Sequence, residues 1–149
     1  MIQRIQSLFL LGVIVLSVLL YFLPVYGFSE LAQVPADSPP SGPIKDLTIA
    51  NNTLLMIING AIAAFSLLAI FLYKNRSLQM RICRLNILLT SVLMVLLYFA
   101  ADTLSSGMNQ QIHFRYGAYL PFFVILFLFL ANYNIRKDDE LVRSADRLR

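Results

Sequence analysis

Few side chains in this sequence could do catalytic or metal chemistry, and they are scattered along the chain. Cys83 is the only cysteine and His113 is the only histidine. A metal site needs several converging ligands, and only Asp102 and Asp46 could join His113, so we expect a solvated loop histidine. A lone Cys83 excludes the disulfide-exchanging quinone reductases, which need cysteine pairs. We therefore predict no catalytic residue, no cofactor and no metal, in a protein that is not an enzyme.

The other polar side chains of interest are amides and hydroxyls inside long apolar runs, namely Gln6, Asn59, Asn86, Thr90 and Asn132. In an apolar environment such groups need partners, and one hydrogen bond between helices contributes about 1 kcal/mol. Asn59 falls at a different depth from Asn86. We therefore expect Gln6, Asn86 and Asn132 to form one polar cluster near the inner ends of their helices. We interpret these residues as structural packing, with ligand binding as the alternative.

Ionisable residues are missing from the middle of every apolar run. Ion- and proton-coupled transporters usually keep such costly residues at membrane depth, because transport depends on them. Asp102 lies at the outer end of its run, where we expect it to pair with Arg115 across a short loop. The sequence therefore disfavours coupled transport.

Four uncharged stretches must position these residues: Ile5–Leu23, Leu54–Tyr73, Leu85–Ala101 and Tyr116–Ile135. The chain is 58% hydrophobic and 13% charged, with a mean hydropathy of +0.71. About 20 helical residues cross a hydrocarbon core of roughly 30 Å. The third helix can start earlier, because arginines near its beginning can extend to the interface. We predict an all-α membrane protein, a four-transmembrane-helix bundle over residues 1–135 with spans of about 5–23, 54–73, 82–102 and 116–135.

The basic residues are distributed unevenly between the two sides of this bundle. One side has Arg4, the basic second loop and the tail, whereas the other has only Lys45 and Arg115. Because Lys and Arg accumulate on the cytoplasmic side, we predict that both termini are cytoplasmic. The same bias accounts for the pI near 9.5 without a nucleic-acid partner.

Two loops have distinct compositions. The first, about Val25–Asn52, contains "VPADSPPSGPIKD", whose prolines argue against a helix or a central strand and favour an extended, mobile loop. We interpret it as a variable loop, with partner docking as the alternative. The second is short and makes helices 2 and 3 an antiparallel hairpin, with Ser77 expected to cap helix 3.

The last segment, 136–149, is a charged cytoplasmic tail that we predict to be an amphipathic helix, because Leu141, Ala145 and Leu148 recur at helical spacing. It either continues helix 4 as one rod or bends near "NYN" (132–134). Its acids could face the basic second loop of the same chain, or its apolar stripe could contact a partner protein. Binding to lipid is less well supported, because the acids nearly cancel the bases. The predicted interaction residues are Arg76, Arg81, Arg84, Asp138, Asp139, Glu140, Leu141, Arg143 and Leu148.

Three segments carry a resemblance to a known family: "YKNRSLQMRICRLN" (73–86), "IRKDDELVRSADRLR" (135–149) and the opening "MIQRIQSLFLL". Together they resemble a small uncharacterised four-helix inner-membrane protein family of Bacteroidota. The resemblance covers nearly the whole chain apart from the Pro-rich loop. It implies a multi-pass protein of the bacterial inner membrane with its charged ends inside. It implies no activity and no catalytic residues.

These observations favour a non-enzymatic accessory or scaffold protein that uses its cytoplasmic tail and basic loop for interaction. Its expected partners are the lipid bilayer and a second membrane protein or further copies of itself. The alternative is a passive pore, or a carrier of a lipid-like or quinone-like molecule. An apolar pocket of about 300 Å³ or more that reaches Asn59 would support that alternative.

Overall fold

The computed structural model describes residues 2–30, 45–73, 75–108 and 110–146 of this 149-residue chain. The long helices in these ranges are α1 (Ile2–Phe22), α2 (Thr53–Phe71), α3 (Arg76–Met108) and α4 (Leu120–Asp146). The strands are β1 (Tyr26–Glu30), β2 (Lys45–Leu47) and β3 (Gln110–Phe114), and short 3₁₀ helices span Ile49–Asn51 and Tyr116–Tyr119. The fold is therefore mainly helical, as predicted, with a small sheet in addition.

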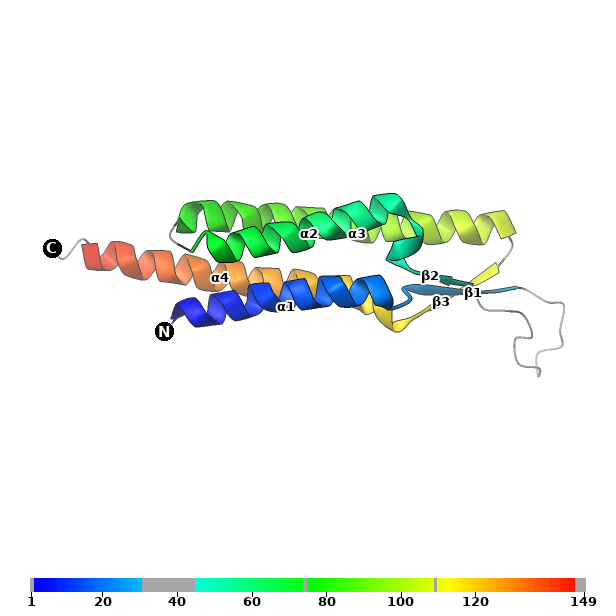
Figure 1. Cartoon of the computed structure of the whole chain (residues 1–149), viewed down its shortest axis with the longest axis horizontal. Coiled ribbons are helices and arrows are strands. Elements are labelled where there is room, and N and C mark those ends of the chain that lie inside the picture. Colours follow the sequence, from blue (N-terminus) through cyan, green and yellow to red (C-terminus); the bar gives the residue numbers. More distant parts are fainter. Residues whose placement is uncertain (1, 31–44, 74, 109, 147–149) are drawn as a thin grey trace.

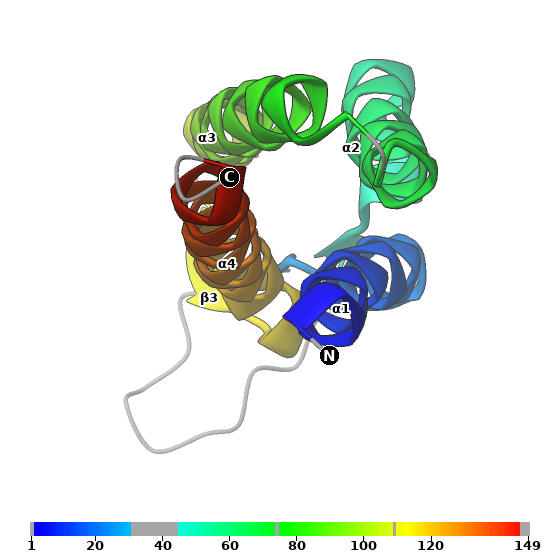
Figure 2. The same cartoon turned by 90° about the vertical axis from the view of Figure 1, so that its left-hand side faces the viewer.

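The four helices lie along one axis, and each runs opposite to its neighbour in the chain (Figure 1). Seen along this axis they form a ring in the order α1, α2, α3, α4, which closes because α4 packs against α1 (Figure 2). The start of α1 and the end of α4 lie at one end of the bundle, the terminal end. The strands lie at the other, the sheet end (Figure 1).

Large apolar side chains occur both inside and outside this ring. The core is formed by buried residues that include Leu10, Val13, Leu93, Leu97 and Leu128. Others are exposed on every helix, among them Leu8, Ile57, Leu88 and Phe129. Three helical segments are long and apolar enough to cross a membrane, namely Thr53–Phe71, Arg76–Thr103 and Tyr116–Val142. The described apolar part of α1, Gln6–Phe22, is shorter.

The helices α3 and α4 extend beyond the predicted spans. Helix α3 covers Arg76–Met108, and α4 continues to Asp146 without a break at residues 132–134. In consequence, α3 projects past α2 at the sheet end, and α4 projects past α1 at the terminal end (Figure 1). The cap of α3 also differs from the expected one. Asn75, and not Ser77, caps it, because Asn75 Oδ1 accepts a hydrogen bond from the Leu78 N–H at 3.4 Å.

An antiparallel sheet in the order β2-β1-β3 forms in the loops that join the helices. The central strand β1 lies within the first loop, where the sequence had argued against a central strand. Residue Gly27 pairs with Asp46 on one side and with His113 on the other. Phe28 of β1 and Leu47 of β2 form a small core with Ala101 of α3. The segment 31–44, with the prolines that motivated the expectation of a mobile loop, lies outside the described residues.

Candidate functional site

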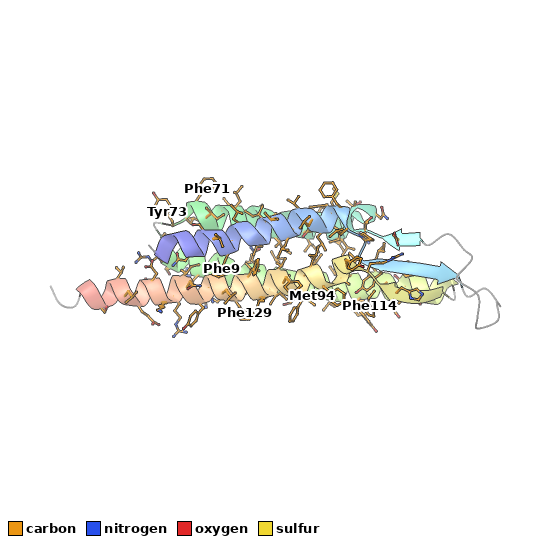
Figure 3. The ribbon with its side chains drawn as sticks, turned by 90° about the horizontal axis from the view of Figure 1, so that it is seen from below. Phe9, Phe71, Tyr73, Met94, Phe114 and Phe129 are labelled. Atoms are coloured by element: carbon orange, nitrogen blue, oxygen red, sulfur yellow. The ribbon has the colours of Figure 1, made fainter. Side chains whose placement is uncertain are left out.

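Polar side chains line the interior of the bundle, whereas many aromatic rings face outward. Figure 3 shows Phe71 and Phe129 pointing away from the helices, and both are more than half exposed, at 71% and 56%. In contrast, Phe9 lies between α1 and α4, where its ring centroid is 6.0 Å from that of Phe127. The buried polar side chains are Gln6, Ser17, Asn59, Ser66, Gln79, Asn86 and Thr90. This distribution is the one that a helix bundle in lipid requires.

Buried amides connect neighbouring helices by donating to main-chain carbonyls. Asn59 Nδ2 donates to Ser17 O at 2.9 Å, which links α2 to α1. Asn86 Nδ2 donates to Ile62 O at 3.2 Å and to Ser66 Oγ at 2.8 Å, which links α3 to α2. Each bond satisfies a donor that the apolar interior would otherwise leave unpaired. These amides therefore hold the ring of helices together.

The expected cluster of Gln6, Asn86 and Asn132 does not form as one hydrogen-bonded group in the described part of the chain. Gln6 Nε2 donates to Asn134 O at 3.1 Å, linking α1 to α4, while the bonds of Asn86 go to α2. Asn132 lines a cleft between α3 and α4 instead. Gln6 and Asn86 donate instead to main-chain carbonyls of adjacent helices. A carbonyl oxygen that accepts the hydrogen bond of its own helix keeps a second lone pair for such a donor.

Three other polar residues form hydrogen bonds in the bundle interior, and only the bond of Gln79 joins two helices. Thr90 Oγ1, a predicted site atom, donates within its own helix to Asn86 O at 2.8 Å. Gln79 Nε2 donates to Ala69 O at 3.0 Å, and Ser66 Oγ donates to Ile62 O at 2.9 Å. Gln79 was not among the predicted site residues. Its spacing of four and seven residues from Cys83 and Asn86 places it on the same helix face, which is the signal that identifies it.

The two residues whose side chains are best suited to catalysis or metal binding are Cys83 and His113. Cys83 is fully buried in the bundle core. His113 lies on β3, opposite Gly27. Within the described ranges, no group of three or more His, Cys, Asp or Glu side chains could hold a metal ion.

Among the described residues of the sheet end, an ion pair and an aromatic contact join different segments of the chain. Arg115 Nε lies 3.6 Å from Asp46 Oδ1, so the ion pair of Arg115 is with β2, where Asp102 had been the expected partner. The rings of Tyr26 and Phe114 meet edge to face at 5.6 Å. Burial raises the pKa of the Tyr26 phenol above 10.0, because it disfavours the charged phenolate. The buried, protonated phenol therefore stabilises the fold fully below its ordinary pKa of 10.0. This contribution is lost as the pH rises through the raised pKa.

Most of the predicted interaction residues gather at the terminal end. Arg76 Nε forms an ion pair with Asp138 Oδ2 at 3.0 Å, and the two side chains are only 23% and 14% exposed. This is the contact that packing of the tail on the basic loop of the same chain would require. Arg136 and Glu140 form a second pair along α4 at 3.1 Å, with side chains 75% and 64% exposed. Arg81, Arg84, Leu141 and Val142 are exposed.

Two predicted interaction residues cannot be placed further. Arg143 belongs to α4 by its main chain, but its side chain is not among the described ones. Leu148 lies outside the described residues.

The Arg76–Asp138 pair is expected to hold the end of α4 against the start of α3. Reversing either charge alone, by Arg76→Glu or Asp138→Arg, places like charges 3.0 Å apart and should release the end of α4. The double reversal should restore it, with a coupling free energy on the order of 1–2 kcal/mol for a partly buried pair. Hydrogen exchange of the amides of residues 138–146 would measure this change.

The exposed Arg136–Glu140 pair is the matched control for this cycle. Its reversal, Arg136→Glu with Glu140→Arg, should give a coupling of no more than about 0.5 kcal/mol, because solvent screens an exposed i, i+4 pair. Equal coupling for the two pairs would mean that Arg76 and Asp138 do not connect the helices in solution.

A cleft of about 410 Å³ opens between α3 and α4 at the terminal end, and it is lined by Met80, Arg84, Asn132, Arg136, Asp139 and Glu140. It is not the apolar pocket at Asn59 that would have supported a pore or carrier, because Asn59 does not line it and most of its lining residues are charged. The Oδ1 atom of Asn132 is buried, and no described group forms a hydrogen bond with it. The cleft therefore combines both signs of charge, whereas this oxygen is shielded from it.

Comparisons with known proteins identify a family but no activity. The sequence model of a family described as "Domain of unknown function (DUF4293)" matches residues 2–148, nearly the whole chain. No curated protein and no solved structure matches the chain. The function has to be inferred from the geometry of the molecule itself.

Proposed function

This chain belongs to the family of the domain of unknown function DUF4293, and from that premise we propose that it is an integral membrane protein of the accessory or scaffold type. We place its four helices across the bacterial inner membrane, with the terminal end in the cytoplasm. The basic residues of the second loop and of α4 gather at the terminal end, which supports this orientation. The protein would act by docking, without catalysis.

The observation that supports this proposal best is the projecting end of α4. This helix continues past the ends of the other helices as far as Asp146 (Figure 1). It carries two adjacent apolar side chains, Leu141 and Val142, which are 48% and 40% exposed. In the proposed orientation these side chains lie in water. Exposed apolar side chains on an ordered helix indicate a surface that binds another protein.

The ion pairs near this projecting end support the same function. Asp138 is engaged by Arg76, and Glu140 by Arg136. The Arg76–Asp138 pair attaches α4 to α3 of the same chain just before the projecting end begins. The end of α4 can therefore pack on its own chain at Asp138 and still dock to a partner beyond it. Leu141 and Val142 lie beyond that contact. We propose that they bind an amphipathic helix of another membrane protein, in the manner of a short two-helix contact.

Site-specific crosslinking in native membranes would test this docking surface. A photoreactive residue at position 141 or 142 should crosslink to one partner, and one at position 140, on the other side of the helix, should not do so. The paired change Leu141→Glu with Val142→Glu should lower partner recovery on the order of tenfold or more, because it introduces charge into an apolar contact. The matched control is Ser144→Glu, which adds one charge at an exposed position without removing apolar surface.

Three results would contradict the proposal. Equal partner recovery with the doubly charged variant would show that α4 does not dock. A product that contains only a second copy of this chain would make the surface a homo-oligomer contact. Labelling of Ser144→Cys and Asn51→Cys from the same side of intact cells would contradict the orientation, and the buried Cys83 would give little background in that assay.

A further inference from the structure

We propose that the bundle carries a belt of aromatic side chains at the sheet end, and that this belt lies in the lipid headgroup layer on that side of the membrane. The proposal rests on the membrane placement proposed above, but it depends neither on docking by the end of α4 nor on which end is cytoplasmic. The belt consists of aromatic side chains between 57% and 82% exposed, namely Phe22 of α1, Tyr98 and Phe99 of α3, and Tyr116 and Tyr119 just before α4.

A main-chain hydrogen bond places the belt residues of α1 and those before α4 at one level of the bundle. The N–H of Gly117 donates to Pro24 O at 3.0 Å. Phe22 precedes Pro24 by two residues. Tyr116 and Tyr119 lie on either side of Gly117. An offset of two residues corresponds to roughly 3 Å along a helix, so the three rings start from almost the same height.

The belt residues of α3 lie close to the same level. Ala101 of α3 belongs to the same small core as Leu47. The Leu47 carbonyl accepts a hydrogen bond at 2.8 Å from the N–H of Val25, the residue after Pro24. Tyr98 lies three residues before Ala101, roughly 5 Å nearer the middle of the bundle. The side chains of the belt therefore begin within about one helical turn of each other along the bundle axis.

Charged residues begin immediately beyond this level. Asp102 is exposed and lies four residues beyond Tyr98, and Arg115 directly precedes Tyr116. In the other direction, α3 has no charged residue between Arg84 and Asp102. The belt therefore marks the boundary between apolar spans and a polar end. Aromatic side chains favour such a boundary in a membrane, because the ring stays on the lipid side while a tyrosine hydroxyl reaches headgroups and water.

The distribution of these rings around the bundle favours lipid over a protein partner. The helices α1 and α3 stand at opposite corners of the ring of helices (Figure 2). Phe22 and Tyr98, on these two helices, are 77% and 64% exposed. One docked helix could cover only one of these sides, whereas lipid surrounds the whole bundle. The belt is also continuous with exposed apolar side chains of the spans, such as Leu19 and Val95, which face lipid in the proposed placement.

Depth-dependent quenching of tryptophan fluorescence would test this belt. The chain contains no tryptophan, so a single introduced one reports its own position in the full chain. Phe22→Trp, Tyr98→Trp and Tyr119→Trp replace exposed rings and are each reconstituted into phosphatidylcholine vesicles. The acyl chains are brominated either near the headgroup or near the chain end. All three variants should lose more fluorescence to the bromine near the headgroup, and they should report the same depth.

Two variants provide matched controls. Phe129 points away from the bundle (Figure 3) and lies ten residues beyond Tyr119. This offset is about 15 Å, near the middle of the hydrocarbon core. Phe129→Trp should therefore be quenched most by bromine near the chain end, which would show that position, and not the preference of tryptophan for the interface, sets the depth. Ser144→Trp, on the projecting end of α4, should lose no fluorescence to either lipid.

Other patterns of quenching would overturn the proposal. Stronger quenching of the belt positions by the deep bromine would move the headgroup layer outward to the strands. Quenching of Tyr119→Trp without quenching of Tyr98→Trp would make the aromatic surface one-sided, as in a contact with a protein. An unquenched belt with a quenched Phe129→Trp would refute the belt alone. Absence of quenching at Phe129→Trp as well would refute the membrane placement on which both proposals rest.

Discussion

Replacing Gly117 with valine is expected to prevent stable folding of the sheet end. Gly117 is buried, and its N–H donates to Pro24 O at 3.0 Å. A Cβ atom at position 117 would lie only 2.6 Å from Pro24 O and 2.9 Å from Pro24 C. These are main-chain atoms, and the adjacent Val25 is fixed by bonds to Leu47 and Arg115 at 2.8 and 3.1 Å. The backbone cannot shift without breaking the sheet, so we expect a loss of about 3 kcal/mol or more.

The buried Cys83 offers a direct readout of this loss. Because it is the only cysteine and is buried, a maleimide dye should react with it only when the bundle opens. Dye fluorescence during heating in mild detergent should show a lower Tm for Gly117→Val, or no folded fraction at all. The matched control is Gly60→Ala, whose Cβ would meet only the hydroxyl of Tyr21, at 3.2 Å, and no main-chain atom of another segment. An unchanged Tm for Gly117→Val would mean that this close approach does not exist in solution.

The helices could be predicted from the sequence because their signal is local. Each apolar run is long enough to identify one helix without knowledge of its neighbours. The ends of α3 and α4 were harder to predict, because each apolar run stops before its helix does. Helix α3 begins at Arg76 and ends at Met108, beyond the predicted span of 82–102 at both ends.

The sheet could not be predicted, because its signal is not local. Strand β2 has three residues, and β1 contains Gly27, which weakens any strand pattern. The pairing of β1 with β3 joins Tyr26 to Phe114, and only the closed ring of helices brings these segments together. Local patterns of three to five residues are too short to indicate such a contact.

The candidate sites likewise depend partly on local sequence and partly on contacts between distant segments. The sequence identifies which amides are buried, because polar residues in apolar runs are conspicuous. It does not identify their partners, since these depend on the rotation of each helix in the ring. Asn132 illustrates the point, because it belongs to the cleft and not to the expected cluster. The cleft is lined by residues of both α3 and α4, so neither helix alone could indicate it.

Replacing Asn86 with aspartate should be among the most damaging changes in the bundle interior. Asn86 is 0% exposed, and its Nδ2 makes two of the bonds that link α3 to α2. Aspartate keeps the size but has no N–H to donate, and Ser66 Oγ already donates to Ile62 O. The variant thus places a carboxylate among acceptors in an apolar core. We expect a loss on the order of 3 kcal/mol, again read from the reaction of Cys83 with the dye.

Asn86→Leu separates the lost bonds from the buried charge. Leucine also removes both donated hydrogen bonds, but at the same time it removes the Asn86 Oδ1 atom, which is buried without a partner among the described residues. Hydrogen bonds between helices in a membrane contribute about 1 kcal/mol, so leucine should cost far less than aspartate. Equally small losses for both variants would indicate that water reaches Asn86. The interior would then be a hydrated path and not the packed, hydrogen-bonded core that the amide links describe.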